Sequence, residues 1–206
     1  EQSTRLTSGC RDELARRQDL LERRRREGQV RHCHGDLHLA NIVLLEGRPV
    51  LFDCLEFDEA LASTDTLYDL AFLLMDLLHQ ERGALAQRLL NGYLDATWDD
   101  DGLALLPLFL ACRAAIRAKV LGFGVAKGAD ASAAGEVAEA RDYLERAIAY
   151  LDPPPACLVA LGGVSGTGKS TLARELAPEL GPAPGAVVLR SDAVRKRLHD
   201  VAPADR

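Results

Sequence analysis

Apolar residues recur at intervals of three and four positions through most of the first 151 residues, which is the spacing of helices that bury one face. This pattern predicts four consecutive helices, at residues 65–81, 84–97, 103–125 and 133–151. The first keeps the spacing most clearly, and its predicted buried positions are Leu67, Leu70, Ala71, Leu74, Leu77 and Leu78. Breaks are expected at Gly83, at 99–102 and at 128–135, because glycine and clustered aspartates favour turns.

Residues 10–27 are also expected to be helical, with a thin stripe of leucines among many arginines and glutamates, and Gly28 is expected to end this helix. The run from Arg23 to Arg26 carries the charge to meet phosphate groups. A run of charges on a helix is more often a solvated face, and we interpret this run in that way.

Between these helical parts, residues 41–53 predict a β-hairpin. Two apolar runs, 42–45 and 50–52, flank a turn at 46–49 that contains glycine and proline. Paired antiparallel strands lie about 5 Å apart, so the start of one strand and the end of the other share one end of the hairpin. Asn41 and Asp53 are therefore expected at the same open end.

Three consecutive prolines divide the chain. Asp152 and the prolines that follow it end the last helix of the first part and form a stiff spacer. We therefore predict a first domain at 1–151, a linker at 152–155 and a second domain at 156–206.

The second part follows a different order of elements. Apolar runs at 157–161 and 186–189 predict two strands, a helix is expected at about 169–180, and Ser191 and Asp192 are placed to cap a short final helix. This order begins a parallel α/β sheet, but two strands are too few to complete one.

The composition narrows the class of protein. The 206 residues allow one or two domains, and a net charge of −6 with a pI near 5.4 argues against a nucleic-acid or membrane-surface binder. Five cysteines without a CxxC pair argue against a disulfide framework and favour a reducing cytoplasm. No apolar run reaches the ~18 residues of a membrane span. Because the chain begins with Glu1, we expect it to be a piece of a longer protein.

The most informative local motif of the first domain is His34-Gly35-Asp36 followed by Asn41. Phosphoryl transfer needs a carboxylate that positions the acceptor hydroxyl, and oxygen ligands that hold magnesium against the phosphates. Protein-kinase catalytic loops place an Asp and an Asn five residues apart for these tasks, as Asp36 and Asn41 are here. A zinc site built from His32, Cys33, His34 and His38 is the alternative, but these ligands are too crowded for a tetrahedron and no second pair follows.

This motif resembles the catalytic loop of the aminoglycoside phosphotransferase family, His-Gly-Asp-x-His-x-x-Asn, and matches every fixed position. The resemblance implies a mostly helical, protein-kinase-like C-terminal lobe of α+β class. It also implies that Asp36 is the catalytic base, that Asn41 and Asp53 are magnesium ligands, and that Asp69 is a structural carboxylate bracing the loop. Kinases of this type also need an N-terminal lobe with a lysine-bearing strand. The residues before His34 contain no such strand, so no phosphotransfer is expected from this piece alone.

The second domain carries a P-loop signature, Gly163-x-x-x-x-Gly168-Lys169-Ser170, between the predicted strand and helix. Its glycines allow backbone N–H groups to surround phosphates, Lys169 adds charge at the β- and γ-phosphates, and the Ser170 hydroxyl ligates Mg²⁺. The predicted ATP-binding residues are Gly163, Ser165, Gly166, Thr167, Gly168, Lys169, Ser170 and Thr171.

Asp192 and Arg195 follow the second predicted strand, where parallel sheets bind their ligands. This Asp-x-x-Arg pattern resembles small P-loop kinases, including polynucleotide 5′-hydroxyl kinases and gluconate-kinase-like enzymes. The resemblance implies a partial α/β P-loop domain in which Asp192 activates the acceptor hydroxyl and Arg195 contacts phosphate. The alternative is that Asp192 only caps the final helix.

The leading hypothesis is a magnesium-dependent phosphotransferase that moves the γ-phosphate of ATP to a hydroxyl of a small molecule and carries a second, P-loop ATP-binding module. A nucleotide-sensing regulatory protein is the alternative from another class. The presence of Asp36, Asn41 and Asp53 together favours chemistry, because a sensor would tolerate the loss of one. A nucleic-acid 5′-hydroxyl kinase is a further alternative, against which the acidic charge and the aromatic content of 5% argue.

Overall fold

The computed structural model describes residues 1–127 and 133–199. The predicted break at 128–135 and the last residues of the predicted second domain, 200–206, therefore lie wholly or partly outside the described residues. Among the described residues, no helix combines the length and the hydropathy that crossing a membrane requires.

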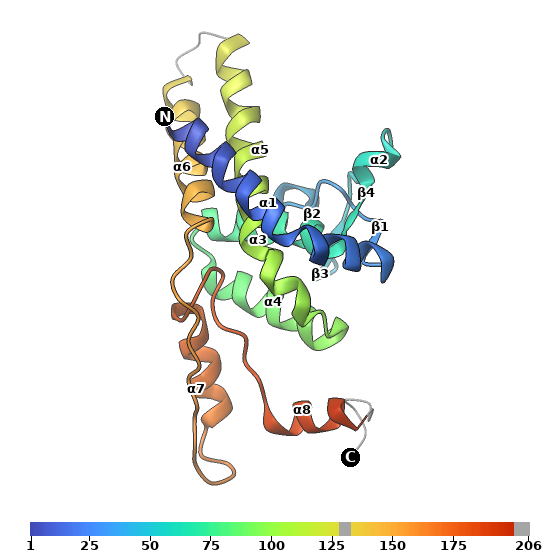
Figure 1. Cartoon of the computed structure of the whole chain (residues 1–206), viewed down its shortest axis with the longest axis vertical. Coiled ribbons are helices and arrows are strands. Elements are labelled where there is room, and N and C mark those ends of the chain that lie inside the picture. The colour runs from blue at the N-terminus through green and yellow to red at the C-terminus, as the bar shows by residue number, and fades with distance from the viewer. Residues whose placement is uncertain (128–132, 200–206) are drawn as a thin grey trace.

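Five long helices build the first part of the chain, and the four consecutive helices predicted there are confirmed. They are α1 (Gln2–Arg26), α3 (Thr66–His79), α4 (Gly83–Thr97), α5 (Leu106–Lys127) and α6 (Ala133–Tyr150). A short 3-10 helix, η2 (Asp100–Leu105), leads into α5. Helix α1 begins eight residues earlier than predicted. Figure 1 shows α5 and α6 lying side by side, with α1 crossing them.

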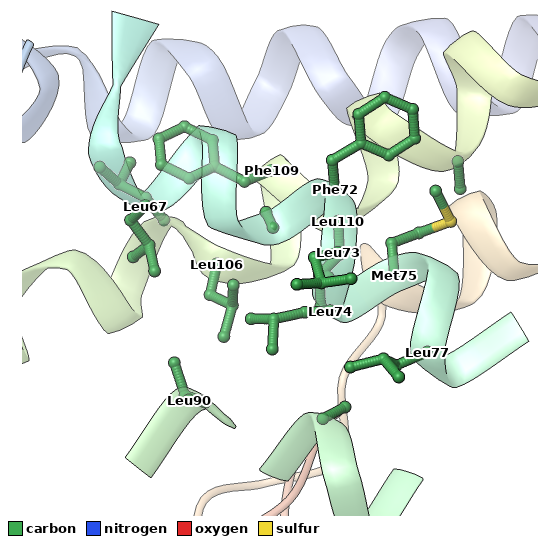
Figure 2. Packing of buried hydrophobic residues seen from close by; sticks show 14 of the residues in the cluster. Leu67, Phe72, Leu73, Leu74, Met75, Leu77, Leu90, Leu106, Phe109 and Leu110 are labelled. Carbon is green, nitrogen blue, oxygen red and sulfur yellow. The ribbon is translucent and has the colours of Figure 1, made fainter. Parts of the chain in front are cut away.

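Helix α3 is the centre of the hydrophobic core. The predicted positions Leu67, Ala71, Leu74 and Leu77 are buried, whereas Leu70 and Leu78 are only partly buried. Buried residues lie on the other side of α3 as well, because the helix is enclosed by α4 and α5. Figure 2 shows the resulting cluster, in which α3 side chains face residues of the neighbouring helices. The labelled neighbours are Leu90, Leu106, Phe109 and Leu110.

The predicted hairpin is confirmed, with a tighter turn than expected. Strand β2 (Ile42–Leu45) pairs with β3 (Arg48–Leu51) in antiparallel register. Only Glu46 and Gly47 form the turn, and both have positive φ, 51° and 75°. A two-residue turn of this handedness matches the twist of paired strands. The predicted turn at 46–49 was therefore too long by the two residues that begin β3.

A second small sheet and a short helix were not predicted. Strand β1 (Val30–His32) pairs antiparallel with β4 (Ser63–Asp65), and helix α2 (Glu59–Ala62) lies directly before β4. The Cys33 N–H donates to the Ala62 carbonyl at 2.8 Å, which extends this contact to the residue before the predicted catalytic loop. The sheet thus fixes where that loop begins.

The interpretation of the arginine run was wrong at one position. Arg24 is 2% exposed, while its three neighbours in the run are exposed. A helix turn carries one residue in three or four to the inner face, and Arg24 lies one turn after Leu20, which packs against the core. The buried guanidinium forms ion pairs with Asp65 and Asp99 and so joins α1 to the segments before α3 and η2.

In the second part, the predicted helices are present but the predicted strands are wrong. Helix α7 (Lys169–Leu176) is continued by a 3-10 turn, η3 (Ala177–Glu179), and α8 (Ser191–Leu198) follows. Residues 157–161 and 186–189 form no strand, because within the described chain neither segment pairs with another strand. Leu158 is accordingly 91% exposed. Figure 1 shows these segments as irregular chain beside α7 and before α8.

Candidate active site

The catalytic-loop motif is anchored to α3 through one buried carboxylate. Asp69 accepts hydrogen bonds from the backbone N–H groups of His34 and Gly35, at 3.1 and 2.9 Å. Asp69 is 6% exposed, so both bonds lie away from water. This geometry confirms the prediction that Asp69 braces the loop.

Gly35 is required at its position by two features of the loop. Its φ is +80°, a conformation that other residues rarely adopt. A Cβ added there would lie 2.6 Å from the Leu55 Cδ1 atom. The chain therefore turns at Gly35, directly before Asp36.

Asp36, His38 and Asn41 lie together after this turn. The Asn41 Nδ2 atom donates to the Asp36 carbonyl at 2.9 Å and to its carboxylate Oδ2 at 3.1 Å. His38 Nε2 lies 3.4 Å from the same Oδ2 atom. The Asp36 side chain keeps 40% of its surface exposed, whereas Asn41 is buried. The Asp36 carboxylate is thus held by two side chains while part of its surface stays accessible. A general base that contacts an acceptor hydroxyl needs both features.

The backbone on both sides of Asp53 is held against the loop by His34. The His34 Nε2 atom bonds to the Phe52 carbonyl at 2.9 Å, and the His34 carbonyl accepts from the Leu55 N–H at 2.9 Å. The Phe52 N–H also donates to the Asn41 carbonyl at 3.1 Å. The structure therefore brings the end of β3 beside the start of β2. Asp53 itself is exposed and has a φ of 59°.

Two further residues support the loop and were missed by the sequence analysis. Asp76 accepts a hydrogen bond from the Leu39 N–H at 2.8 Å. Asp69 and Asp76, both on α3, therefore hold the two ends of the loop. Arg113 of α5 is buried, donates to the Gly35 carbonyl at 3.4 Å and lies 3.7 Å from the Asp69 carboxylate. Its guanidinium also lies over the Tyr68 ring, 3.9 Å from the centroid. Burial lowers the pKa of Arg113 from its usual value, although the neighbouring carboxylates oppose this effect.

Both supports carried a signal in the sequence. Asp69 and Asp76 are seven residues apart, which places them on one face of a helix two turns apart. Arg113 lies four residues after the buried Phe109, which places its charge on the apolar face of the helix. A charge at a core position usually has a buried partner.

Replacing Asp69 by asparagine tests the anchoring of the loop. We expect Asp69→Asn to lower the free energy of unfolding by about 1–3 kcal/mol, because the amide can accept only one of the two N–H bonds and leaves the other donor unsatisfied. Urea unfolding followed by circular dichroism measures the difference. The exposed Asp95→Asn on α4 is the matched control and should unfold like the unaltered protein. Equal midpoints for all three proteins would show that Asp69 does not anchor the loop.

The P-loop segment has the backbone that its glycines predict. Gly163, Gly166 and Gly168 have φ values of 150°, 82° and 82°, and α7 begins at the next residue, Lys169. The Lys169 Nζ atom donates to the Val164 carbonyl at 2.6 Å, so the ammonium group reaches across the loop. A loop of N–H groups, a helix start and a lysine thus meet at one place.

A cavity of about 910 Å³ joins this loop to Asp192. Residues 165–171 and 190–192 line one part of it, and side chains of α4, η2 and α5 line another. The structure therefore brings Lys169, Ser170 and Asp192 to one cavity. Arg195 is exposed and is not among the residues that line it.

The predicted magnesium site depends on oxygen atoms of two residues, Asn41 and Asp53. Within residues 1–127 and 133–199, no three His, Cys, Asp or Glu side chains gather closely enough to hold a metal ion by themselves. Magnesium in kinases is bound through one or two protein oxygens together with substrate phosphates and water, so it does not require such a cluster. Asn41 uses its Nδ2 atom for Asp36 and leaves its oxygen available, and Asp53 is exposed beside it in the fold. These two residues fit a magnesium ion that phosphate groups complete.

Comparison with known families agrees with the two motifs. The family model described as phosphotransferase enzyme family matches residues 2–106, and the model described as AAA domain matches residues 158–206. The first match contains the loop from His34 to Asn41, Asp53 and Asp69, and the second contains the P-loop and Asp192. The predicted pairing of a phosphotransferase of this kind with a P-loop module is thereby confirmed.

The chain is similar to two longer mycobacterial proteins. The uncharacterized protein Rv2004c of Mycobacterium tuberculosis and the uncharacterized protein Mb2027c of Mycobacterium bovis are each 38% identical to this chain over 184 residues. The match covers 89% of this chain and 35% of each relative, so the chain spans about a third of the length of these curated relatives. No solved structure matches the chain.

Proposed function

Since the chain belongs to the phosphotransferase enzyme family, we propose that the protein of which it is part transfers the γ-phosphate of ATP to a hydroxyl group of a small molecule. The observation that carries this proposal is the position of Asp36. Its carboxylate is fixed by Asn41 on a loop that Asp69 anchors, yet 40% of its surface stays exposed to a substrate. A structural carboxylate would not need that exposure.

In this proposal Asp36 is the catalytic base. Its free carboxylate oxygen accepts the proton of the acceptor hydroxyl as that oxygen attacks the γ-phosphorus. His38, 3.4 Å from the other oxygen, and Asn41 hold the carboxylate in one orientation. His34 has a structural role in this proposal, because its ring nitrogen forms a hydrogen bond with the Phe52 carbonyl.

Asn41 and Asp53 would hold magnesium. The ion supplies positive charge that stabilises the phosphate oxygens during transfer. The hydrogen bonds between His34 and the residues around Asp53 keep the end of β3 beside Asn41, so one ion can be approached from both strands.

We further propose that the chain contains two modules, at 1–151 and 156–206, joined by a proline-rich linker at 152–155. The first corresponds to a kinase-like C-terminal lobe, and the second to part of a P-loop kinase-like domain. In the second module Gly163, residues 165–168, Lys169, Ser170 and Thr171 would bind ATP. Ser170 would ligate magnesium, Asp192 would activate the acceptor hydroxyl, and Arg195 would contact phosphate.

A second candidate function has one observation in its favour. The P-loop and Asp192 line the same cavity as helices of the first module, so nucleotide at the P-loop could regulate the first module without being consumed. A nucleotide-sensing role predicts binding at the P-loop with no transfer that depends on Asp192. Nucleic acid is the less favoured acceptor, since the net charge of −6 opposes phosphate backbones.

Lys169→Ala in the full-length protein tests the proposed P-loop site. We expect the affinity of that site for ATP to fall roughly 10- to 100-fold, because a charge-assisted contact to phosphate is lost, while the first site keeps its affinity. Isothermal titration calorimetry with MgATP measures both. Arg174→Ala, at an exposed position later in α7, is the control and should bind like the unaltered protein. Unchanged binding by Lys169→Ala would refute the assignment.

A further inference from the structure

Two amide side chains of α4 bond to the backbone of the second module. The Gln87 Nε2 atom donates to the Ala186 carbonyl at 2.9 Å. The Asn91 Nδ2 atom donates to the same carbonyl at 3.3 Å, and the Asn91 Oδ1 atom accepts from the Val188 N–H at 2.7 Å. Gln87 and Asn91 are four residues apart and therefore lie on one face of the helix.

The Asn91 amide occupies the place of a neighbouring strand. In an extended chain the carbonyl of one residue and the N–H of the second residue after it point to the same side, and a paired strand bonds to both. A primary amide offers one donor and one acceptor at a similar spacing. Asn91 uses them on Ala186 and Val188 in this way. The bonds thus satisfy backbone groups that an open strand edge would leave unpaired.

Apolar packing reaches the core at the same place. Ala183 and Val187 pack against the hydrophobic core that α3, α4 and α5 form, and Ala177 of η3 is 2% exposed. Gln87 is itself 2% exposed, so its bond to Ala186 is formed away from water. A buried amide that lacked this partner would be costly. The contact therefore belongs to the packed structure.

Gly185 lies in a tight turn of the second module, next to Gln87 of α4. A Cβ added to this residue would lie 2.5 Å from the Ala177 carbonyl oxygen, 2.8 Å from Pro178 Cα and 3.1 Å from Gln87 Cγ. Its φ of +129° is also a conformation that side-chain-bearing residues rarely adopt. Two of these three neighbours belong to the same module as Gly185 and one to α4, so a larger residue would disturb the turn of its own module as well as the contact with Gln87.

From these contacts we propose that α4 is the docking surface of the first module for the P-loop module, and that Gln87 and Asn91 hold the segment Ala186–Val188 as a strand partner would. Only three residues separate Val188 from Asp192, which lines the P-loop cavity. Docking therefore fixes the segment that presents Asp192 to the cavity. Gln87 and Asn91 are positioning residues for the second site, although neither belongs to either site. This docking follows from hydrogen bonds and packing and does not depend on the proposed chemistry.

Hydrogen–deuterium exchange on the full-length protein tests this docking. In Asn91→Ala we expect the peptide covering residues 185–190 to exchange about 10-fold faster or more, because the Val188 N–H loses its acceptor and the buried segment loosens. Asn91→Ser, whose hydroxyl is too short to reach both the Ala186 carbonyl and the Val188 N–H, should change exchange in the same direction. Arg88→Ala, at an exposed position on α4 between the two amides, is the control and should exchange at the unaltered rate.

Exchange of the α3 peptides reports whether each variant is folded. If Asn91→Ala also loosens α3, the decision passes to Asn91→Ser, which keeps a small polar group at this half-buried position. Faster exchange at 185–190 with an unchanged α3 supports the docking surface. Exchange at 185–190 that stays at the unaltered rate in Asn91→Ser, or in a folded Asn91→Ala, would overturn it.

Discussion

Replacing Asp36 by asparagine in the full-length protein is expected to reduce phosphotransfer by about 10²- to 10⁴-fold, because that is the contribution of a positioned general base. The substitution keeps the size of the side chain, so the contacts to Asn41 and the path of the loop are largely preserved. Asn cannot accept the acceptor proton. The loss should therefore appear in kcat, with the affinity for MgATP little changed.

The measurement is transfer of labelled γ-phosphate from ATP into a fractionated small-molecule extract. Asp95→Asn serves as the matched control, because Asp95 is an exposed carboxylate on α4 far along the chain from the loop. Equal transfer by the Asp36→Asn variant and the unaltered protein would remove Asp36 from the mechanism. Transfer that depends on Lys169 but not on Asp36 would place the chemistry in the P-loop module instead.

Arg24→Ala is expected to lower the free energy of unfolding by about 3–5 kcal/mol, the cost of leaving a buried ion-pair partner uncompensated. Arg24 donates to Asp65 at 2.7 and 2.8 Å and to Asp99 at 2.8 Å, and all three residues are buried. Tyr93 also donates to Asp99 at 2.7 Å, and the Leu67 N–H at the start of α3 donates to Asp65. Removing the cation leaves two carboxylates side by side. The free energy of unfolding of a domain is only about 5–15 kcal/mol, so this loss would be a large fraction of it.

Urea unfolding gives the stability difference, and Arg25→Ala is the control. Arg25 is exposed and pairs with Glu22 of its own helix, so its loss should cost less than about 1 kcal/mol. A cost for Arg24→Ala no larger than the cost for Arg25→Ala would contradict the account.

The same cluster predicts a dependence on pH. Burial alone would raise the pKa of the Asp99 carboxyl, but the hydrogen bonds from Arg24 and Tyr93 outweigh burial and hold that pKa below its usual range. A carboxylate with a depressed pKa stabilises the fold above its unfolded pKa, and this stability is lost as the pH falls through the folded value. The unaltered protein should therefore lose stability on acidification more steeply than Arg24→Ala.

The helices could be predicted because their apolar spacing is a local property of the sequence. Helix α3 keeps that spacing over four turns, and the hairpin carries its turn residues between two apolar runs. Strands β1 and β4 could not be predicted in this way. Each has three residues with little apolar character, and they pair across more than 30 positions through contacts that only the folded chain brings together.

The predicted strands of the second part were wrong because a local apolar pattern does not by itself supply a pairing strand. Residues 186–189 have a strand composition, but a strand also needs a paired neighbour, and here Asn91 and Gln87 take part of that role. The candidate site also has a part that the sequence predicts and a part that depends on the folded chain. The spacing of Asp36 and Asn41 is readable in the sequence, whereas the support from Arg113 arises from the packing of α5 against α3.

The most direct test of the whole account is calorimetric titration of the full-length protein with ATP in the presence of magnesium. The account predicts two binding events: one survives Lys169→Ala, and both weaken when magnesium is chelated, because phosphate groups complete the proposed metal sites at Asn41, Asp53 and Ser170. An absence of heat on titration, with the protein shown to be folded, would contradict the claim that this chain is built to hold ATP at two places.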